Sequence, residues 1–595
     1  IFGSRGLGDV YKRQPADIES VTVLKGPAAA ALYGVRAGNG AIVYTTKKGG
    51  YTGGRGIKAT YSYGLEISQI SHTPDLQDKY AQGFGGGFTD SLGNPTIGAF
   101  DEGDPGPDRL WFTADDVSFG TSNSWGPTVE SLGRDPVDNV GEFFQTSLSH
   151  TNHLSLGGGN EHSSFRFGFG NTRQEGIIPN TNFKRTSLTF AANTRVSNKI
   201  NLSGTMNYTK SGGTKAQNGS NLSGVMLGLT RAPASYSLAG EGEDGWKYEN
   251  GEQRQYFTFY DNPYWTVYEN PFTDDINRMY GNVHFTYKPL DWLDVSYRLG
   301  GDFYTDSRKQ IFAVGSWDPP EPTGQIEQNI KRYREVYSDL LINLHHDFSD
   351  DFGAGITLGN NANHIYSQDL YGRGRTLAIP GFYNLSNASD LYTHEVHDII
   401  RTTAIFFDAN IDWKRMLYLQ ITGRNEWAST FGPNKNNFFY PSVNASFILS
   451  EVIPENDVLS FAKIRVGFAQ AGINPDPYTS NTYFVQPFFT DGFTDGLSFP
   501  YLGQNGFGNS DVLGNDDLKP EKVTGIEGGL DIRLWNGRLN LDLTYYNQKS
   551  TDILVNRPIA ASSGYEFFVS NSGEMVNKGI ELVATGSPFR GKDFN

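Results

Sequence analysis

The chain has 595 residues, of which only 37% are hydrophobic, and this fraction is low for a protein organised around a thick apolar core. An aromatic fraction of 14% together with 71 glycines favours strands and tight turns over helix bundles. The net charge of -16 argues against a nucleic-acid partner, and the absence of cysteine excludes disulfides and thiolate metal sites.

The first fourteen residues, IFGSRGLGDVYKRQ, lack the long apolar centre and the small-residue cleavage site of a signal peptide. We expect residues 1–14 to be a non-native leader rather than a native loop. We also read no stop signal at Phe594 and Asn595. The sequence is therefore interpreted as an internal fragment.

The composition of residues 15–50 predicts a small mixed α/β unit. Residues 17–23 and 41–46 have the composition of strands, and the alanine-rich run 28–33 has that of a short helix. Gly26 and Pro27 predict a turn, and the glycines of 34–40 allow a loop with positive φ angles. Nothing later in the chain has this composition.

After Gly50 the dominant pattern is alternation with a period of two. In residues 200–208, apolar side chains and glycine alternate strictly with Asn, Ser and Thr. The polar positions are Asn201, Ser203, Thr205 and Asn207. Similar alternation recurs along the chain, including residues 187–193, 283–287, 295–299, 403–411 and 539–547. Such strands face two different solvents.

The connections between these strands alternate between short and long. Residues 196–199, 288–294 and 536–538 are short links, whereas residues 209–279 form a long polar and aromatic stretch. Outer-membrane barrels sort their connections in this way, with short periplasmic turns and long outer loops. Because alternation alone also occurs in half-buried antiparallel sheets, a soluble multi-sheet protein, such as a carbohydrate-binding or adhesin array, remains the alternative.

The stretch DIESVTVLKGPAAAALYGVRAGNGAIVYTTKKG, residues 17–49, closely resembles the end of the plug domain of SusC/RagA-like TonB-dependent outer-membrane transporters. The residues that carry this motif are Asp17, Lys25, Gly26, Tyr33, Gly34, Arg36, Gly40 and Lys47. Later stretches resemble the same family in the same order, among them residues 158–188, 423–447, 461–474, 518–554 and 571–582. One departure is Asn425-Glu426-Trp427-Ala428, where many relatives carry an Asp, Gly and Ser pattern.

The resemblance implies an all-β transmembrane antiparallel β-barrel with a small α/β plug domain, in a bacterial outer membrane. Of the plug only the C-terminal part is expected, in residues 15–50. Residues 51–595 are expected to form an incomplete barrel with long extracellular loops, and a complete barrel of this class has about 22 strands.

The implied function is TonB-dependent active import of oligosaccharides or similar large solutes. The implied partners are a TonB-type energy-coupling protein, a SusD-like surface lipoprotein, the solute and outer-membrane lipid. Two alternatives stay open: a peptide importer of the same family, and a passive or adhesive surface protein. We do not expect an enzyme, since the sequence has no cysteine and no G-x-S-x-G nucleophile motif.

Solute capture is predicted for the aromatic residues of the loops. Flat rings beside polar groups suit sugars, whose C–H faces stack on aromatics. The candidates are Trp246, Tyr256, Tyr260, Tyr264, Trp265 and, in a second aromatic loop, Phe488. The alternatives are an interfacial aromatic girdle and a loop folded on itself.

No cofactor and no metal site are expected. An acidic loop that contains Asp101, Asp104 and Asp108 leaves a weak option for calcium, but the EF-hand order is absent. His394 and His397 lack the spacing of H-E-x-x-H and are expected to be loop residues. Gly34, Gly38 and Gly40 do not form a nucleotide-binding motif.

Overall fold

The structure, a computed structural model, describes most of the chain. The described residues are 17–26, 34, 38, 40–47, 56–82, 88–89, 95–96, 124–126, 128–133, 135–217, 222–242, 244–257, 259–318, 322–432, 434, 436–454, 456–486, 488–489 and 497–587. The predicted leader, the helix predicted at 28–33, and the acidic loop around Asp101 to Asp108 lie outside these residues.

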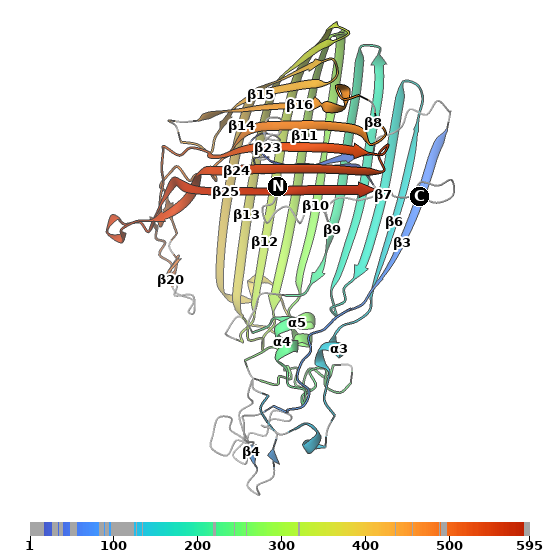
Figure 1. Ribbon diagram of the computed structural model, residues 1–595. Helices are drawn as coiled ribbons and strands as arrows, with labels where there is room; N and C mark the ends of the chain where they lie inside the picture. Colours follow the sequence, from blue (N-terminus) through green and yellow to red (C-terminus); the bar gives the residue numbers. More distant parts are fainter. Residues whose placement is uncertain are drawn as a thin grey trace.

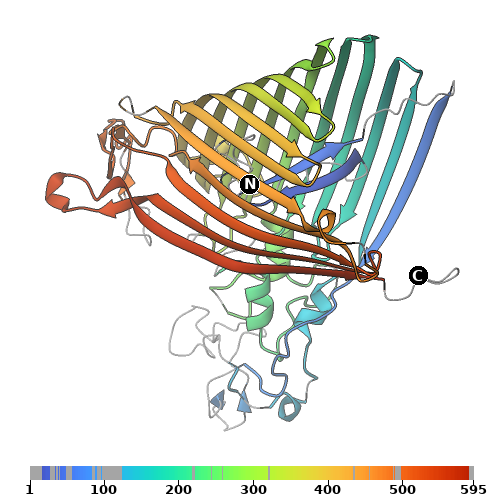
Figure 2. The same ribbon diagram turned by 45° about the horizontal axis from the view of Figure 1, so that its top comes forward.

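Two strands at the start of the chain form a sheet of their own. β1 (Ile18–Leu24) pairs antiparallel with β2 (Ala41–Thr46). Figure 2 shows this blue pair inside the curved wall made by the later strands. Gly34 and Gly40, in the connection between the two strands, have φ angles of 76° and 98°, so the predicted use of positive φ in this loop is confirmed.

The wall is a barrel of antiparallel strands whose neighbours mostly follow sequence order. Its strands are β3 (Ile57–Ser68), β6 (Ser147–Gly159), β7 (Ser163–Glu175), β8 (Asn182–Ser197), β9 (Ile200–Lys215), β10 (Phe272–Leu290), β11 (Leu293–Phe312), β12 (Gln325–Ser349), β13 (Phe352–Leu377), β14 (Ala388–Trp413), β15 (Leu417–Ala428), β16 (Asn437–Ile448), β17 (Leu459–Ile473), β22 (Val512–Leu513), β23 (Glu521–Leu534), β24 (Leu539–Pro558) and β25 (Phe567–Gly586). Figure 1 shows them side by side. The predicted barrel fold is confirmed.

The two faces of the wall have opposite polarity. On β9 the apolar Leu202 and Met206 are exposed, whereas Asn207 and Thr209 are buried. On β8, likewise, Leu188 and Phe190 are exposed while Arg185, Ser187 and Thr189 are buried. A water-soluble sheet would bury the apolar set. The wall therefore presents its apolar face outward, to lipid, and its polar face inward, as the alternation predicts.

The connections are sorted between the two ends of the barrel. Residues 160–162, 198–199, 291–292, 350–351 and 414–416 make short turns at one end, while the long connections from β3 to β6, from β9 to β10 and from β17 to β22 leave and rejoin the wall at the other. By the usual asymmetry of outer-membrane barrels, the long-loop end is extracellular. Within the described part of the chain, no helix is long and apolar enough to cross a membrane.

The long loops carry the remaining elements, and several of them pack together beyond the barrel end. These elements are α3 (Asn139–Phe143), α4 (Val225–Arg231), α5 (Pro263–Glu269), β4 (Phe88–Thr89), β5 (Pro95–Thr96), β18 (Phe484–Val485), β19 (Phe488–Phe489), β20 (Leu497–Ser498), β21 (Gly508–Asn509), and the short 3-10 turns η4 (Glu130–Leu132), η5 (Leu385–Asn387) and η7 (Ala561–Ser563), with η6 (Leu449–Glu451) at the other end. We call the packed part around α3, α4 and α5 the loop cap (Figure 1). Its apolar core includes Phe143, Leu229, Leu238 and Tyr256.

One sequence expectation was wrong. His394 and His397, expected in a loop, lie inside β14, which is far longer than the predicted strand at 403–411. Because successive side chains of a strand point to opposite faces, an odd separation of three residues puts these two histidines on opposite sides of the wall. They cannot share a metal ion, and His397 instead contacts Glu395 and Tyr366.

Candidate functional site

The candidate site is the set of contacts that holds the β1–β2 pair inside the barrel. The first contact is made by Asp17, which precedes β1 and is 5% exposed. Its Oδ1 accepts from Nη2 of Arg166 on β7 at 2.6 Å and lies 3.1 Å from Nε2 of His153 on β6. Its Oδ2 accepts from Oγ1 of Thr189 on β8 at 2.7 Å. One carboxylate thus ties the start of β1 to three neighbouring barrel strands.

The surroundings of Asp17 hold it in its ionised form. Burial alone would raise the pKa of Asp17, but hydrogen bonds from Thr189 and Arg166 outweigh burial and leave the pKa below its usual value. Its backbone oxygen accepts from the amide of Lys47, which fixes it to the end of β2. A buried, fully paired carboxylate is costly to withdraw from its partners because Arg166 would remain buried without its counter-charge.

The second contact lies at the other end of β1. Nζ of Lys25 forms an ion pair with Glu581 on β25, and both side chains are largely exposed to water. The adjacent Gly26 approaches Glu527 on β23 so closely that a Cβ there would stand 2.8 Å from Oε1. Water competes for exposed ion pairs, so each is worth little. This contact therefore sets the position of the end of β1 but contributes little to the stability with which the β1–β2 pair is held.

The third contact is a close approach between Gly34 and a buried ion pair on β15. Arg424 donates from Nε to Oε2 of Glu426 at 2.8 Å, and both side chains are buried. A Cβ on Gly34 would stand 2.8 Å from Nη2 of Arg424 and 2.9 Å from Oε2 of Glu426. With a φ of 76° as well, only glycine fits at position 34.

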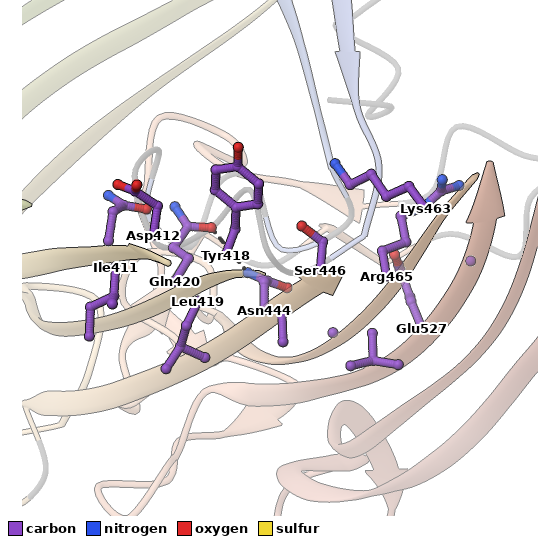
Figure 3. Close-up of a pocket in the computed structure, with 15 residues that line it drawn as sticks. Ile411, Asp412, Tyr418, Leu419, Gln420, Asn444, Ser446, Lys463, Arg465 and Glu527 are labelled. Carbon is purple, nitrogen blue, oxygen red and sulfur yellow. Dashed lines mark hydrogen bonds between the residues drawn. The ribbon is translucent and has the colours of Figure 1, made fainter. Parts of the chain in front are cut away.

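A cavity of about 460 Å³ lies against the inner wall near the short-turn end, beside the second contact. Its labelled side chains include Gln420, Asn444, Lys463, Arg465 and Glu527 (Figure 3). Arg465 donates to Asp542 and Thr544, each at 2.5 Å, and Asn444 donates to Gln420 at 3.3 Å. The cavity is lined by hydrogen-bonding and charged groups together with apolar side chains such as Ile411 and Leu419, and its polar groups suit contacts that can break and re-form in water.

Of the predicted motif residues, Asp17, Lys25, Gly26 and Gly34 contact the barrel, Lys47 bonds to Asp17, and Gly40 lies just before β2. Tyr33 and Arg36 lie outside the described residues. Sequence reasoning missed the barrel partners His153, Arg166 and Thr189. The only available signal was their position on the polar face of strands, which many other residues share.

The loop aromatics predicted to capture solute mostly belong to the interior of the loop cap. Trp246 and Trp265 are buried together with Ala313, and Tyr256 is buried in the main cap core. Nε1 of Trp265 donates to Oγ of Ser316 at 2.8 Å. Tyr260 and Tyr264 are half-buried against the same core. In this structure the rings of Trp246, Tyr256 and Trp265 pack the cap, and solute capture by these five residues and by Phe488 stays a prediction.

The exposed rings of the cap are others. Tyr248, Phe259 and Tyr268 are exposed, and Tyr268 stacks on Trp246 with ring centroids 5.5 Å apart. Phe259 contacts Trp317 edge-on. Phe488, the candidate of the second aromatic loop, lies in β19, whose backbone pairs with β20. No sequence pattern separated the exposed rings from the buried ones.

A buried carboxyl of the cap was also missed. Asp261 precedes α5 and is 2% exposed. Its Oδ1 accepts from Nε2 of Gln253 at 2.6 Å and from the amide of Trp317 at 2.9 Å, whereas its Oδ2 is buried without a hydrogen-bond partner among the described groups. Burial raises the pKa of Asp261 to about 7, although both of these hydrogen bonds act in the opposite direction. A carboxyl with such a pKa would make the stability of the cap depend on pH.

The known proteins that are similar to this chain are TonB-dependent receptors. A family model described as "TonB dependent receptor-like, beta-barrel" matches residues 224–595. The TonB-dependent receptor SusC of Bacteroides thetaiotaomicron is 23% identical over 614 residues, a match that covers 98% of this chain and 55% of that protein. The TonB-dependent receptor P3 of Formosa agariphila is 22% identical over 609 residues, with 98% and 53% covered. The chain thus spans about half the length of the curated relatives it matches.

Solved structures share the fold. The RagAB peptide importer in its "open-open" state superposes with a TM-score of 0.80 at 20% identity, covering 99% of this chain and 64% of that one. Its "closed-closed" state gives a TM-score of 0.78 at 20% identity, with the same coverage. The chain therefore belongs to the TonB-dependent receptor-like β-barrel family, and its resemblance to the SusC/RagA-like outer-membrane members is confirmed.

Proposed function

We propose that the protein imports oligosaccharides or similar large solutes across the bacterial outer membrane and that the β1–β2 pair belongs to the plug that gates the barrel. In this proposal residues 15–50 are the C-terminal part of the plug and residues 51–595 belong to the barrel. The observation that carries it is Asp17, whose buried carboxylate ties the pair to β6, β7 and β8 inside a polar lumen.

The contacts support a plug that is held firmly but not irreversibly. They consist of hydrogen bonds and ion pairs, and the barrel face behind them is polar. Polar contacts can be exchanged for hydrogen bonds to water when the plug moves, whereas separation of an apolar interface would expose apolar surface to water. A TonB-type coupling protein would supply the mechanical work, and a SusD-like surface lipoprotein would cooperate in solute capture at the extracellular end.

The solute class rests on the loops. The cap exposes Tyr248, Phe259 and Tyr268 beside many polar groups, a surface that suits the C–H faces of sugars. A peptide importer of the same family is the second candidate, favoured by the structural likeness to a RagAB complex whose description names peptide import. We further propose that the chain carries no catalytic activity and needs no cofactor.

A cross-link between plug and wall tests the proposal. Because the chain has no cysteine, a Lys25→Cys/Glu581→Cys variant presents one thiol on each side of an exposed contact. A short bis-maleimide should join the two thiols and abolish energised uptake of a glycan mixture by cells. The single-cysteine variants, treated in the same way, should retain uptake.

Each alternative gives a different result. Uptake of peptides but not glycans, sensitive to the same cross-link, would select the peptide importer. Unchanged passage through cross-linked protein, or passage that does not require the coupling protein, would select a passive surface protein and overturn the proposal.

A further inference from the structure

The outer face of β6, β7 and β8 is ordered in rows, because directly paired residues share a face of the sheet. Leu154, Phe169 and Leu188 form one apolar row across the three strands. The next row toward the loop cap is Asn152, Asn171 and Thr186. The row after that is His150, Arg173 and Lys184. Along each strand the face thus passes from apolar to hydrogen-bonding to basic in two successive steps of the side-chain alternation. Figure 1 shows β6, β7 and β8 side by side.

The basic row is unfavourable as it stands. Arg173 and Lys184 are exposed and directly opposite each other, and like charges in such pairs repel. Neither side chain has a hydrogen bond or ion pair with any residue that the structure describes. Of the acidic groups nearby, Asp275 pairs with Lys210 at 3.3 Å. Glu175 is exposed on the same strand as Arg173 but forms no ion pair with it or with Lys184. An external anion would relieve this repulsion.

A hollow of about 500 Å³ adjoins the same rows. It is lined by Tyr61, Asn152, Leu154, Phe169, Asn171 and Arg173. Its side nearer the mid-barrel is apolar, its middle carries two amides, and its side toward the cap carries a guanidinium. Hydrogen bonds hold the side chains at the rim of the hollow in place. The Tyr61 hydroxyl donates to Oδ1 of Asn152 at 2.7 Å, and the Tyr63 hydroxyl lies 2.8 Å from Nδ1 of His150.

We propose that this hollow binds a lipid with an anionic, phosphate-bearing headgroup from the outer leaflet of the membrane. An acyl chain would lie along Leu154 and Phe169, where hydrocarbon already faces the wall. The phosphate would accept charge-assisted hydrogen bonds from Arg173 and Lys184. The amides of Asn152 and Asn171, between these two levels, match the hydroxyl and ester groups of a headgroup.

The test is lipid binding by the full protein in detergent micelles, followed by native mass spectrometry. Three probes are compared: a bis-phosphorylated glucosamine lipid, phosphatidylcholine and inorganic phosphate. The phosphorylated lipid should remain bound, phosphatidylcholine should dissociate, and inorganic phosphate should fail to displace the bound lipid, because it lacks the acyl chain.

The decisive variant is Arg173→Gln/Lys184→Gln, which leaves the fold intact because both side chains are exposed. It should bind the phosphorylated lipid at least about tenfold more weakly. The matched control is Lys288→Gln, an exposed lysine near the opposite end of the barrel that pairs with Asp294, and it should bind normally.

Three results would overturn the proposal. Equal retention of phosphatidylcholine would show that the headgroup charge is irrelevant. Displacement of the lipid by inorganic phosphate would show an anion site with no lipid requirement. Undiminished binding by the double variant, with β-sheet content confirmed by circular dichroism, would show that the basic row does not bind the lipid.

Discussion

The barrel wall and the loop cap belong to one chain, yet they bury opposite kinds of side chain. In the cap the buried core is an apolar and aromatic cluster with Phe143, Leu229 and Tyr256 at its centre, beside a few buried polar groups such as Asp261. In the wall the buried set includes Thr189, Asn207 and Arg424, while leucines and phenylalanines stand exposed. The same hydrophobic effect explains both, because the cap is surrounded by water whereas the wall has lipid outside and a wet lumen inside.

The largest effect is expected from a substitution that disrupts the polar contacts on the inner face of the wall. Asp17→Ala leaves Arg166 buried without its counter-charge, and loss of one partner of a buried pair costs about 3–5 kcal/mol. We expect the β1–β2 pair to detach from β6, β7 and β8 while the barrel persists. Hydrogen exchange of the β1 and β2 amides measures this. Asp17→Asn, which keeps the acceptor oxygen, should show a smaller loss. Unchanged protection in Asp17→Ala would contradict the anchor.

A comparable effect is expected from a substitution in the apolar core of the loop cap. Trp265→Ala removes a large buried ring and the hydrogen bond to Ser316, at a cost of about 3–5 kcal/mol. The cap should unfold at lower temperature while heat-modifiable migration of the barrel on gels stays normal. Tyr268→Ala, which removes an exposed ring of the same helix, is the control. If Trp265→Ala weakened solute binding with no change in cap stability, the ring would be a ligand contact rather than a core residue.

A charge on the outer face of the wall should also be costly, although the position is exposed. Phe190→Arg places a guanidinium in the apolar band and should destabilise the barrel by about 2–4 kcal/mol, depending on depth. Val196→Arg, near the short-turn end of the same strand, should cost little. Urea unfolding in lipid vesicles compares the two. Equal stability of both variants would mean that lipid does not contact Phe190.

A smaller effect concerns pH and the cap. Because burial raises the pKa of Asp261 to about 7 from 3.8, the unfolded state loses its proton first as the pH rises, and cap stability should fall between about pH 4 and 7. Asp261→Asn keeps the acceptor for Gln253 and Trp317 and removes the charge. The variant should be more stable than the parent at pH 8, by about 1–3 kcal/mol, and should lose the pH dependence. A parent cap whose melting temperature is flat from pH 4 to 8 would argue against a buried, titrating Asp261.

The smallest effect is expected at the exposed contact. Lys25→Gln removes an ion pair with Glu581 that is open to water, and such pairs contribute about 0–1 kcal/mol. The β1–β2 pair should therefore keep its hydrogen-exchange protection. Loss of protection as large as that of Asp17→Ala would reverse the order of the two contacts.

The sequence predicted what depends on local pattern. Alternation on β9 predicted both faces correctly because each strand residue has only two directions in which to point. Connection lengths predicted the two ends of the barrel because outer-membrane barrels have short turns at one end and long loops at the other. The extent of β14 was not predictable, because its extracellular half, with His394 and His397, carries no apolar stripe.

Contacts between distant residues could not be predicted from one sequence. Asp17 meets Arg166 and Thr189 across 149 and 172 residues, and the pairing depends on how the barrel curves. The aromatic loop was equally ambiguous, because Trp265 and Tyr268 have similar local sequence but face the cap core and the solvent respectively. Which ring is buried follows from the packing of α4 and α5, not from composition.

The separation of lipid from a polar lumen by the barrel wall is tested most directly by a scan of spin labels along β9 in a lipid bilayer. Since the chain has no cysteine, single substitutions at positions 202–209, including Met206→Cys and Asn207→Cys, can each carry one label. We predict that accessibility to membrane-dissolved oxygen alternates along the strand, high at Met206 and low at Asn207. Equal access of a water-soluble nickel chelate to both positions, with no alternation, would contradict a wall that separates lipid from a polar lumen.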